Sequence, residues 1–194
     1  MQPRGIPMFI QTEATPNPAT LKFLPGKPVL PGSTRDFRNT DEATESPLAS
    51  RLFGITNVSG VFLGHDFVTV TRSGGEWQQL KPAILGVIMD HYMSGVSILS
   101  DMSAPAEAES DSEFFDEEHA PLVKIIKDLL DQRVRPAVAQ DGGDITFKGF
   151  KDGVVYLNMQ GSCAGCPSST ATLKHGVENL LRHFVPEVTE VRPV

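Results

Sequence analysis

The chain has 194 residues, of which 40% are apolar, and a formal net charge of −7. This length and apolar content allow one or two domains with a buried core, and no apolar run approaches the roughly 20 residues of a membrane-spanning helix. The charge balance argues against nucleic acid as a partner, and we expect no membrane partner.

Residues 1–100 are predicted to form a first small domain of strands and helices. Ser46 before a proline is typical of a helix start and predicts a short helix over 47–53. A longer amphipathic helix is predicted over 80–93, ending near Gly95. Apolar runs bounded by turn residues predict four strands, at 8–12, 21–24, 58–63 and 67–71.

The negative charge is concentrated between the two halves of the chain. Residues 101–118 contain eight acidic side chains and no basic one, whereas the flanking halves are nearly neutral. Because this segment also lacks apolar periodicity, we predict an extended, flexible linker over 101–115. A second domain is then expected over 116–194.

The second domain is predicted to fold in the order helix, strand, strand, helix, strand, so the fold class is α+β with two small α/β-type domains. Its first helix is expected to begin near Leu122 and to stop near Pro136, with Arg133 on its apolar face. Its second helix is predicted over 168–184. The strands are predicted at 145–150, 154–159 and 188–191. The residues expected on the buried helix faces are Leu122, Ile125, Ile126, Leu129, Leu130, Leu173, Val177, Leu180, Leu181 and Phe184.

The chain has two cysteines, Cys163 and Cys166, in the segment Gly161-Ser-Cys-Ala-Gly-Cys-Pro-Ser168. This segment leaves a predicted strand and enters a predicted helix. We therefore expect both sulfurs to lie near the unpaired N–H groups at the helix start, which favour the thiolate. That effect is worth only about 0.3–1 kcal/mol, whereas a four-ligand zinc site is worth roughly 10–16 kcal/mol. Coordination must therefore decide what the loop holds.

Three kinds of site are compatible with this pair. Two chains could pool four thiolates around one [4Fe–4S] cluster, which is the interpretation that the residues favour. The pair could instead act as a thioredoxin-like dithiol, although the aromatic-Cys-x-Pro-Cys surroundings of that class are absent. A structural zinc site would need histidines, but His175 and His183 are too far apart in sequence for the usual ligand spacing.

Two longer motifs resemble a known family. Asp141-Gly-Gly-Asp-Ile145, followed by Gly161-Ser-Cys-Ala-Gly-Cys-Pro-Ser-Ser169, resembles the C-terminal domain of NifU-type iron–sulfur scaffold proteins. Met8-Phe-Ile-Gln-Thr-Glu-Ala-Thr-Pro-Asn-Pro18, with Leu21-Lys-Phe-Leu-Pro-Gly26, is similar to the N-terminal domain of the Nfu subfamily. The two matches occur in the order found in that subfamily and leave mainly the linker unmatched.

The resemblance implies an iron–sulfur carrier rather than an enzyme. It implies that Cys163 and Cys166 ligate a [4Fe–4S] cluster that bridges a homodimer and is then passed to apo iron–sulfur proteins. Asp141 to Asp144 are expected to shape the loop near the site rather than to act as ligands. The segments with which full-length NifU builds clusters are missing, which favours late delivery.

The expected location is a reducing compartment. Two closely spaced cysteines do not form the disulfide framework of a secreted domain, and residues 1–7 lack the apolar stretch of a secretion signal and the long Arg- and Ser-rich run of an organellar presequence. The resemblance implies the bacterial cytoplasm, which we expect here, or the mitochondrial matrix of a eukaryote as the alternative.

Overall fold

A computed structural model describes residues 8–100, 113–164 and 166–194. The chain divides into two compact units, Met1–Ala106 and Glu107–Val194. Both units combine helices and strands, which confirms the α+β class. Most of the predicted linker over 101–115 lies outside the described residues.

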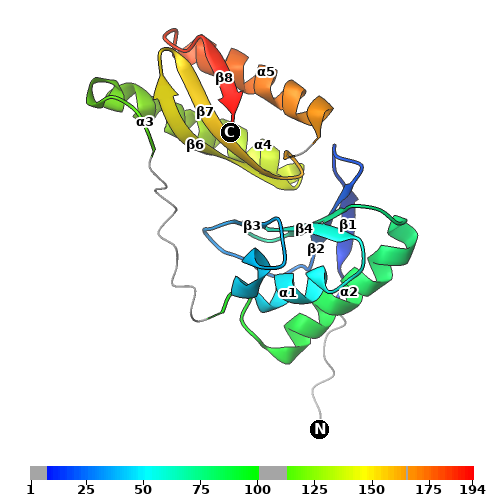
Figure 1. Cartoon of the computed structure of the whole chain (residues 1–194). Coiled ribbons are helices and arrows are strands. Elements are labelled where there is room, and N and C mark those ends of the chain that lie inside the picture. Colours follow the sequence, from blue (N-terminus) through cyan, green and yellow to red (C-terminus); the bar gives the residue numbers. More distant parts are fainter. Residues whose placement is uncertain (1–7, 101–112, 165) are drawn as a thin grey trace. The chain divides into compact units, whose positions relative to one another are not determined.

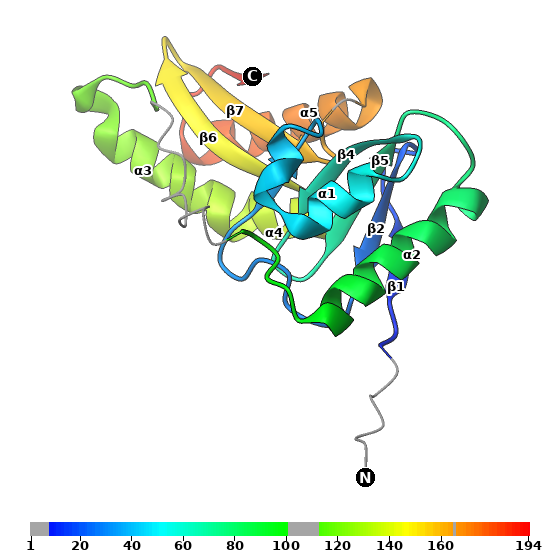
Figure 2. The same cartoon turned by 60° about the horizontal axis from the view of Figure 1, so that its bottom comes forward.

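The N-terminal unit is a five-stranded antiparallel sheet with helices on one side, as the views in Figures 1 and 2 show. The strand order is β1-β2-β5-β4-β3. Side chains of the sheet and of the helices α1 and α2 form one apolar core. The elements are β1 (Gln11–Ala14), β2 (Thr20–Leu24), β3 (Arg35–Phe37), η1 (Glu42–Glu45), α1 (Pro47–Phe53), β4 (Val58–Leu63), β5 (Val68–Arg72) and α2 (Trp77–Ser94).

Most of these elements agree with the sequence prediction. The hydroxyl of Ser46 accepts a hydrogen bond from the Ala49 N–H at 3.2 Å, so α1 begins as predicted. The first strand, predicted over 8–12, instead begins at Gln11, where pairing with β2 starts. Strand β3 was not predicted, because its three residues include two charged side chains and present no apolar run.

The C-terminal unit follows the predicted order of helix, strand, strand, helix, strand. Its three-stranded sheet has the order β6-β7-β8, with β6 and β7 antiparallel and β7 and β8 parallel. The three α-helices contribute to one core with this sheet. The elements are η2 (Glu117–His119), α3 (Ala120–Leu129), η3 (Leu130–Val134), α4 (Arg135–Gln140), β6 (Gly143–Lys151), β7 (Val154–Gly161), α5 (Pro167–Phe184) and β8 (Glu190–Pro193).

The first helix of this unit does not stop near Pro136, so that prediction is wrong. It continues through a π-helical turn, η3, into α4, which ends at Gln140. Its buried side chains recur at every fourth residue, namely Ile126, Leu130, Val134 and Val138. An α-helix would rotate such a row by about 40° at each step. The wider π turn offsets this rotation and keeps the last two valines in the core.

The same π turn changes the position of Arg133. The prediction placed Arg133 on the apolar face, but the structure places it on the surface, with its guanidinium 5.2 Å from the ring centroid of Phe184. Phe184 is itself 45% exposed and Ile125 is 50% exposed. The predicted apolar faces were therefore wider than the buried ones, because helical periodicity alone does not show where a neighbouring element ends.

Residues just before η2 pack on the edge of β6. The Phe114 N–H donates to the Lys148 carbonyl at 3.2 Å, and the Phe150 N–H donates to the Phe114 carbonyl at 2.9 Å. A Cβ on Gly149 would lie 2.5 Å from the Phe114 ring, so a larger residue at this position would displace that ring. Glu113 also forms an ion pair with Lys127 at 2.7 Å. The C-terminal unit thus includes these residues, which lie at the end of the predicted linker range.

None of the helices in the described parts of the chain is long and apolar enough to cross a bilayer. One of them, α2, contains a buried histidine. His91 is 1% exposed, and its Nε2 has no hydrogen-bond partner. Burial, and then the charge of Arg51, lower the pKa of His91 below its ordinary value of 6.5.

We expect the N-terminal unit to lose stability as the pH falls below about 6.5. Because the pKa of His91 is lowered in the folded state, the unfolded chain binds more protons in this range, and acid therefore favours unfolding. Guanidinium unfolding of the full chain, followed through the fluorescence of Trp77, measures this between about pH 8 and pH 5. His91→Leu should remove most of the slope; a variant that keeps the wild-type pH dependence would contradict the assignment to His91.

Candidate metal centre

The two cysteines lie on the loop between β7 and α5, and neither forms a disulfide. Cys166 is the residue that precedes the first turn of α5, and Pro167 begins the helix. Cys163 is 6% exposed, whereas Cys166 is partly exposed. One loop therefore presents two thiols in different surroundings.

The prediction that both cysteines favour the thiolate is wrong for Cys163. The pKa of the Cys163 thiol is raised to about 11, mainly by burial and to a smaller extent by the carboxylates of Asp141 and Asp144, although the Ser162 hydroxyl lowers it. Cys163 lies before the helix, so the small field at the helix start does not offset its desolvation. Its thiol stays protonated at neutral pH until a metal displaces the proton.

Cys166 has the predicted thiolate character. The pKa of Cys166 is lowered to about 7, first by the hydroxyl of Ser168, whose Oγ lies 3.4 Å from Sγ, and then by the side chain and backbone of Ser169. These donors all belong to the first turn of α5. At neutral pH a large fraction of Cys166 is therefore already in the form that binds metal.

A turn formed by Asp141 to Asp144 holds the cysteine loop in place. Gly143 pairs with Gly161 at the end of the β6–β7 ladder. The Ser162 N–H donates to the Gly142 carbonyl at 3.2 Å, and the Ser162 hydroxyl donates to the Asp141 carbonyl. These contacts agree with the expectation that the turn shapes the loop.

Glycine is required at two positions of this turn. A Cβ on Gly143 would lie 2.7 Å from Cys163 Sγ and 2.7 Å from the Gln160 carbonyl oxygen. Gly142 has a φ of 81°, in the left-handed region that other residues rarely adopt. The buried thiol therefore packs directly against the backbone of the turn, and any side chain at Gly143 would displace it.

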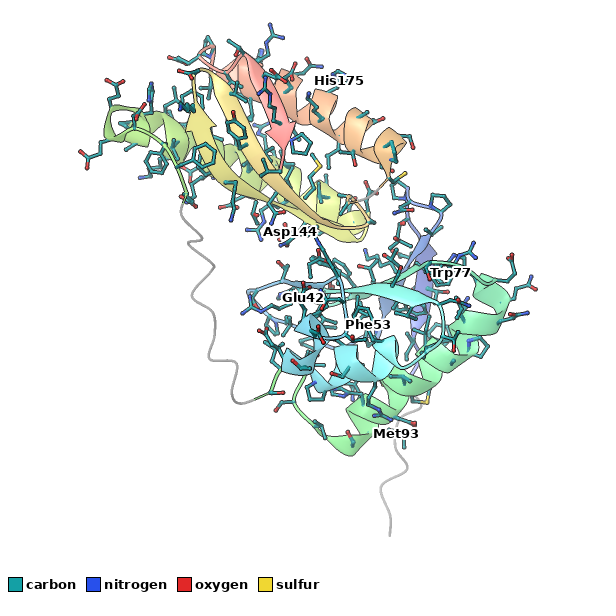
Figure 3. The ribbon with its side chains drawn as sticks, viewed as in Figure 1. Glu42, Phe53, Trp77, Met93, Asp144 and His175 are labelled. Carbon is teal, nitrogen blue, oxygen red and sulfur yellow. The ribbon has the colours of Figure 1, made fainter. Side chains whose placement is uncertain are left out.

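The turn is anchored to the preceding helix by an ion pair. Asp144, labelled in Figure 3, lies at the start of β6, and its carboxylate receives two hydrogen bonds from Arg135 of α4. The Nε–Oδ1 distance is 2.9 Å and the Nη2–Oδ2 distance is 2.8 Å. Arg135 also contacts Asp131 at 3.1 Å, and these contacts raise the pKa of the Arg135 guanidinium. The Asp144 side chain is only 5% exposed, so Arg135 is its charge partner in a nearly dry environment.

Thr170 holds the loop from the side of α5. Its hydroxyl donates to the Cys163 carbonyl at 3.0 Å, and its N–H donates to the Cys166 carbonyl at 2.9 Å. Sequence reasoning did not single out Thr170 or Arg135. The only signal for Thr170 is its place in the first turn after the cysteines, and the spacing of Arg135 from Asp144 matches no recognisable pattern.

The other two kinds of site find less support in the structure. Within the described residues, no third cysteine, histidine or carboxylate joins the thiols in a ligand-sized group; the one group of that size is Asp116, Glu118 and His119. His175 lies midway along α5 and is exposed, as Figure 3 shows. The loop follows a β-hairpin rather than the βαβ unit typical of a thioredoxin-like dithiol.

We expect Cys166 to react with an alkylating reagent much faster than Cys163 in the metal-free chain, with a midpoint near pH 7. A double change, Ser168→Ala with Ser169→Ala, should raise that midpoint, because it removes hydroxyl donors that stabilise the thiolate. Mass spectrometry after timed iodoacetamide treatment measures both sites. Thr172→Ala, on the same helix, should leave the midpoint unchanged. Equal rates at the two cysteines would contradict the assigned difference.

Arg135→Gln should lower the free energy of unfolding of the C-terminal unit by about 1–3 kcal/mol, because it leaves the buried Asp144 carboxylate without its charge partner. The value lies below that of a fully buried pair, since the guanidinium is partly exposed. The variant should also make Cys163 more reactive. Arg192→Gln, which disrupts an exposed ion pair with Glu190, is the control. Unchanged stability together with a protected Cys163 would exclude this role of Arg135.

Comparison with known proteins identifies the family. Residues 10–95 match the family model described as the scaffold protein Nfu/NifU N terminal, and residues 126–192 match the NifU-like domain. A human protein named NFU1 iron-sulfur cluster scaffold homolog, mitochondrial, is 50% identical over 96% of this chain. The homolog of that name from Drosophila erecta is 51% identical over 96% of the chain. NifU-like protein 5, mitochondrial, from Arabidopsis thaliana is 49% identical over 95%.

The chain spans 72% of the length of the human relative, 65% of the fruit-fly one and 67% of the plant one. The two family models lie in the two units that the structure separates, in the order that the sequence motifs indicated. Scaffold proteins hold a cluster rather than catalyse a reaction, which confirms the prediction that the chain is not an enzyme. The chain belongs to the Nfu family of NifU-like iron–sulfur cluster scaffold proteins.

Proposed function

We propose that this scaffold carries a [4Fe–4S] cluster between two copies of the chain, bound by Cys163 and Cys166 of each copy, and passes it to apo iron–sulfur proteins. The main support is the ligand count. One loop offers two thiols, and no third ligand joins them among the described residues. A cube with four iron atoms ordinarily takes four thiolates, so a second loop must supply the other two.

The unequal thiols suit a carrier that must release its cargo. Cys166 is partly exposed, so an incoming thiolate from a recipient protein can replace it first. Cys163 is packed against Gly143 and held through Thr170, so it retains the cluster until a second recipient thiolate arrives. A pocket with four buried cysteines in one chain would oppose such stepwise exchange.

We also propose a mitochondrial location, the matrix alternative of the sequence analysis. The human, fruit-fly and plant relatives are all named as mitochondrial proteins. No comparison supports the bacterial cytoplasm that was expected first. That expectation rested on the family resemblance, which allows both locations, and on the absence of a targeting pattern in the first residues. Both are weaker support than relatives of about 50% identity over nearly the whole chain.

Anaerobic reconstitution with iron and sulfide tests the cluster. The full chain should take up about four iron and four sulfide per dimer and should become dimeric as it does so. Cys163→Ser and Cys166→Ser should each abolish stable uptake while circular dichroism shows an intact fold. Ser168→Ala keeps both ligands and should still bind the cluster. A monomer that takes up no iron but reduces disulfides would favour the dithiol function, and retained zinc without iron uptake would favour a structural metal.

A further inference from the structure

Helix α3 has a second row of side chains beside the row that enters the core. Val123, Ile126 and Leu130 are buried. Next to them, Leu122, Ile125 and Leu129 recur at spacings of three and four residues, and Ile125 is 50% exposed while the two leucines are partly exposed. Spacings of three and four residues are those of a seam between packed helices. Leu122 and Leu129 also pack against the core, so Ile125 is the most exposed side chain of this row.

The row continues to a charged residue at each end. Four residues before Leu122 lies Glu118, in η2, and four residues after Leu129 lies Arg133, in η3; both are exposed. No carboxylate of a described residue lies within ion-pair distance of Arg133, whereas Arg135, Arg182 and Arg192 of the same unit all have acidic partners. The guanidinium of Arg133 instead stacks on the half-exposed Phe184, which extends the apolar surface onto α5.

The order of residues along this row is self-complementary. If two copies of α3 pack antiparallel about a two-fold axis near Ile125, Glu118 faces the partner's Arg133 and Leu122 faces the partner's Leu129. Ile125 then lies next to the partner's Ile125 on the axis. Both charged ends are satisfied at once, which a parallel arrangement would not achieve because it places like charges together.

We propose that the row Glu118, Leu122, Ile125, Leu129 and Arg133 is a self-association surface, on which two copies of this chain pack their α3 helices antiparallel. One short helix with a single strongly exposed aliphatic side chain buries a modest area. The association is therefore weak and depends on concentration, unlike that of an obligate dimer. The opposed Glu and Arg ends fix its direction and register rather than its strength.

This surface is separate from the cysteine loop. Ile125 lies 15 residues before Gln140, the end of the helix that leads to the loop, or about 20 Å at 1.5 Å per residue. Antiparallel packing sends the two loops to opposite ends, on the order of 40 Å apart, where they cannot share one cluster. The α3 contact is thus formed by the metal-free chain, and together with loop-to-loop contact it generates assemblies larger than a dimer.

Sedimentation equilibrium of the metal-free full chain at rising concentration tests this surface. The background carries Cys163→Ser and Cys166→Ser, so neither disulfides nor clusters contribute. We expect a reversible monomer–dimer equilibrium. Ile125→Asp should abolish it, and Glu118→Arg or Arg133→Glu alone should weaken it about tenfold. The double swap, Glu118→Arg with Arg133→Glu, should restore it. Lys151→Glu, an exposed charge reversal at the end of β6, is the matched control.

A chain that stays monomeric at every concentration would overturn the proposal, and so would association that Ile125→Asp leaves unchanged. Failure of the double swap to restore association would overturn the antiparallel register. The same variants, made with both cysteines present, show whether the row instead binds a recipient protein. If the chain is monomeric but Ile125→Asp slows cluster transfer to an apo-ferredoxin, the row binds recipients and not a second copy. The sedimentation outcomes do not depend on whether the cysteines bind a cluster; only the transfer measurement rests on that proposed function.

Discussion

The site depends on one close approach, that of the Cys163 thiol to the backbone of Gly143. No side chain fits between them, so the turn before β6 and the loop after β7 form a single unit although they are about twenty residues apart in sequence. The Arg135–Asp144 ion pair connects this unit to α4, and Thr170 connects it to α5. Contacts from β6, α4 and α5 thus restrict the Cys163 side chain to a single position. A metal ligand must be held in this way if it is to keep the metal in place.

This arrangement makes the two thiols unequal. Desolvation keeps the pKa of Cys163 high, whereas the serine donors at the start of α5 lower that of Cys166. The difference comes from two opposing effects within four residues: burial disfavours the charged form of one sulfur, and hydrogen bonds favour the charged form of the other. For a protein that must both hold and release a cluster, a firmly held ligand beside an accessible one is a physically sensible pair.

The π turn is the second determinant of the C-terminal unit. It allows the helix to continue past Pro136 to Gln140, and it keeps Val134 and Val138 in the core. It also brings Arg135 to Asp144 and moves Arg133 outward to Phe184. Two arginines that are two residues apart therefore have different roles. Arg135 holds the turn next to the cysteine loop, and Arg133 lies on the surface. π turns are rare in helices and often lie near functional sites.

The sequence by itself determined the element types, the two units, the family and the cysteine pair. Those features depend on local patterns: apolar period, turn residues, a helix-start signal at Ser46, and motifs that are continuous in the chain. It did not determine β3, the continuation past Pro136, or the exposure of Ile125 and Phe184, since these depend on neighbours that are distant in sequence. Only the tertiary structure decided the burial of Cys163 and the ion pair between Arg135 and Asp144. A pKa and an ion pair depend on which groups surround an atom in space, and chain order does not specify those neighbours.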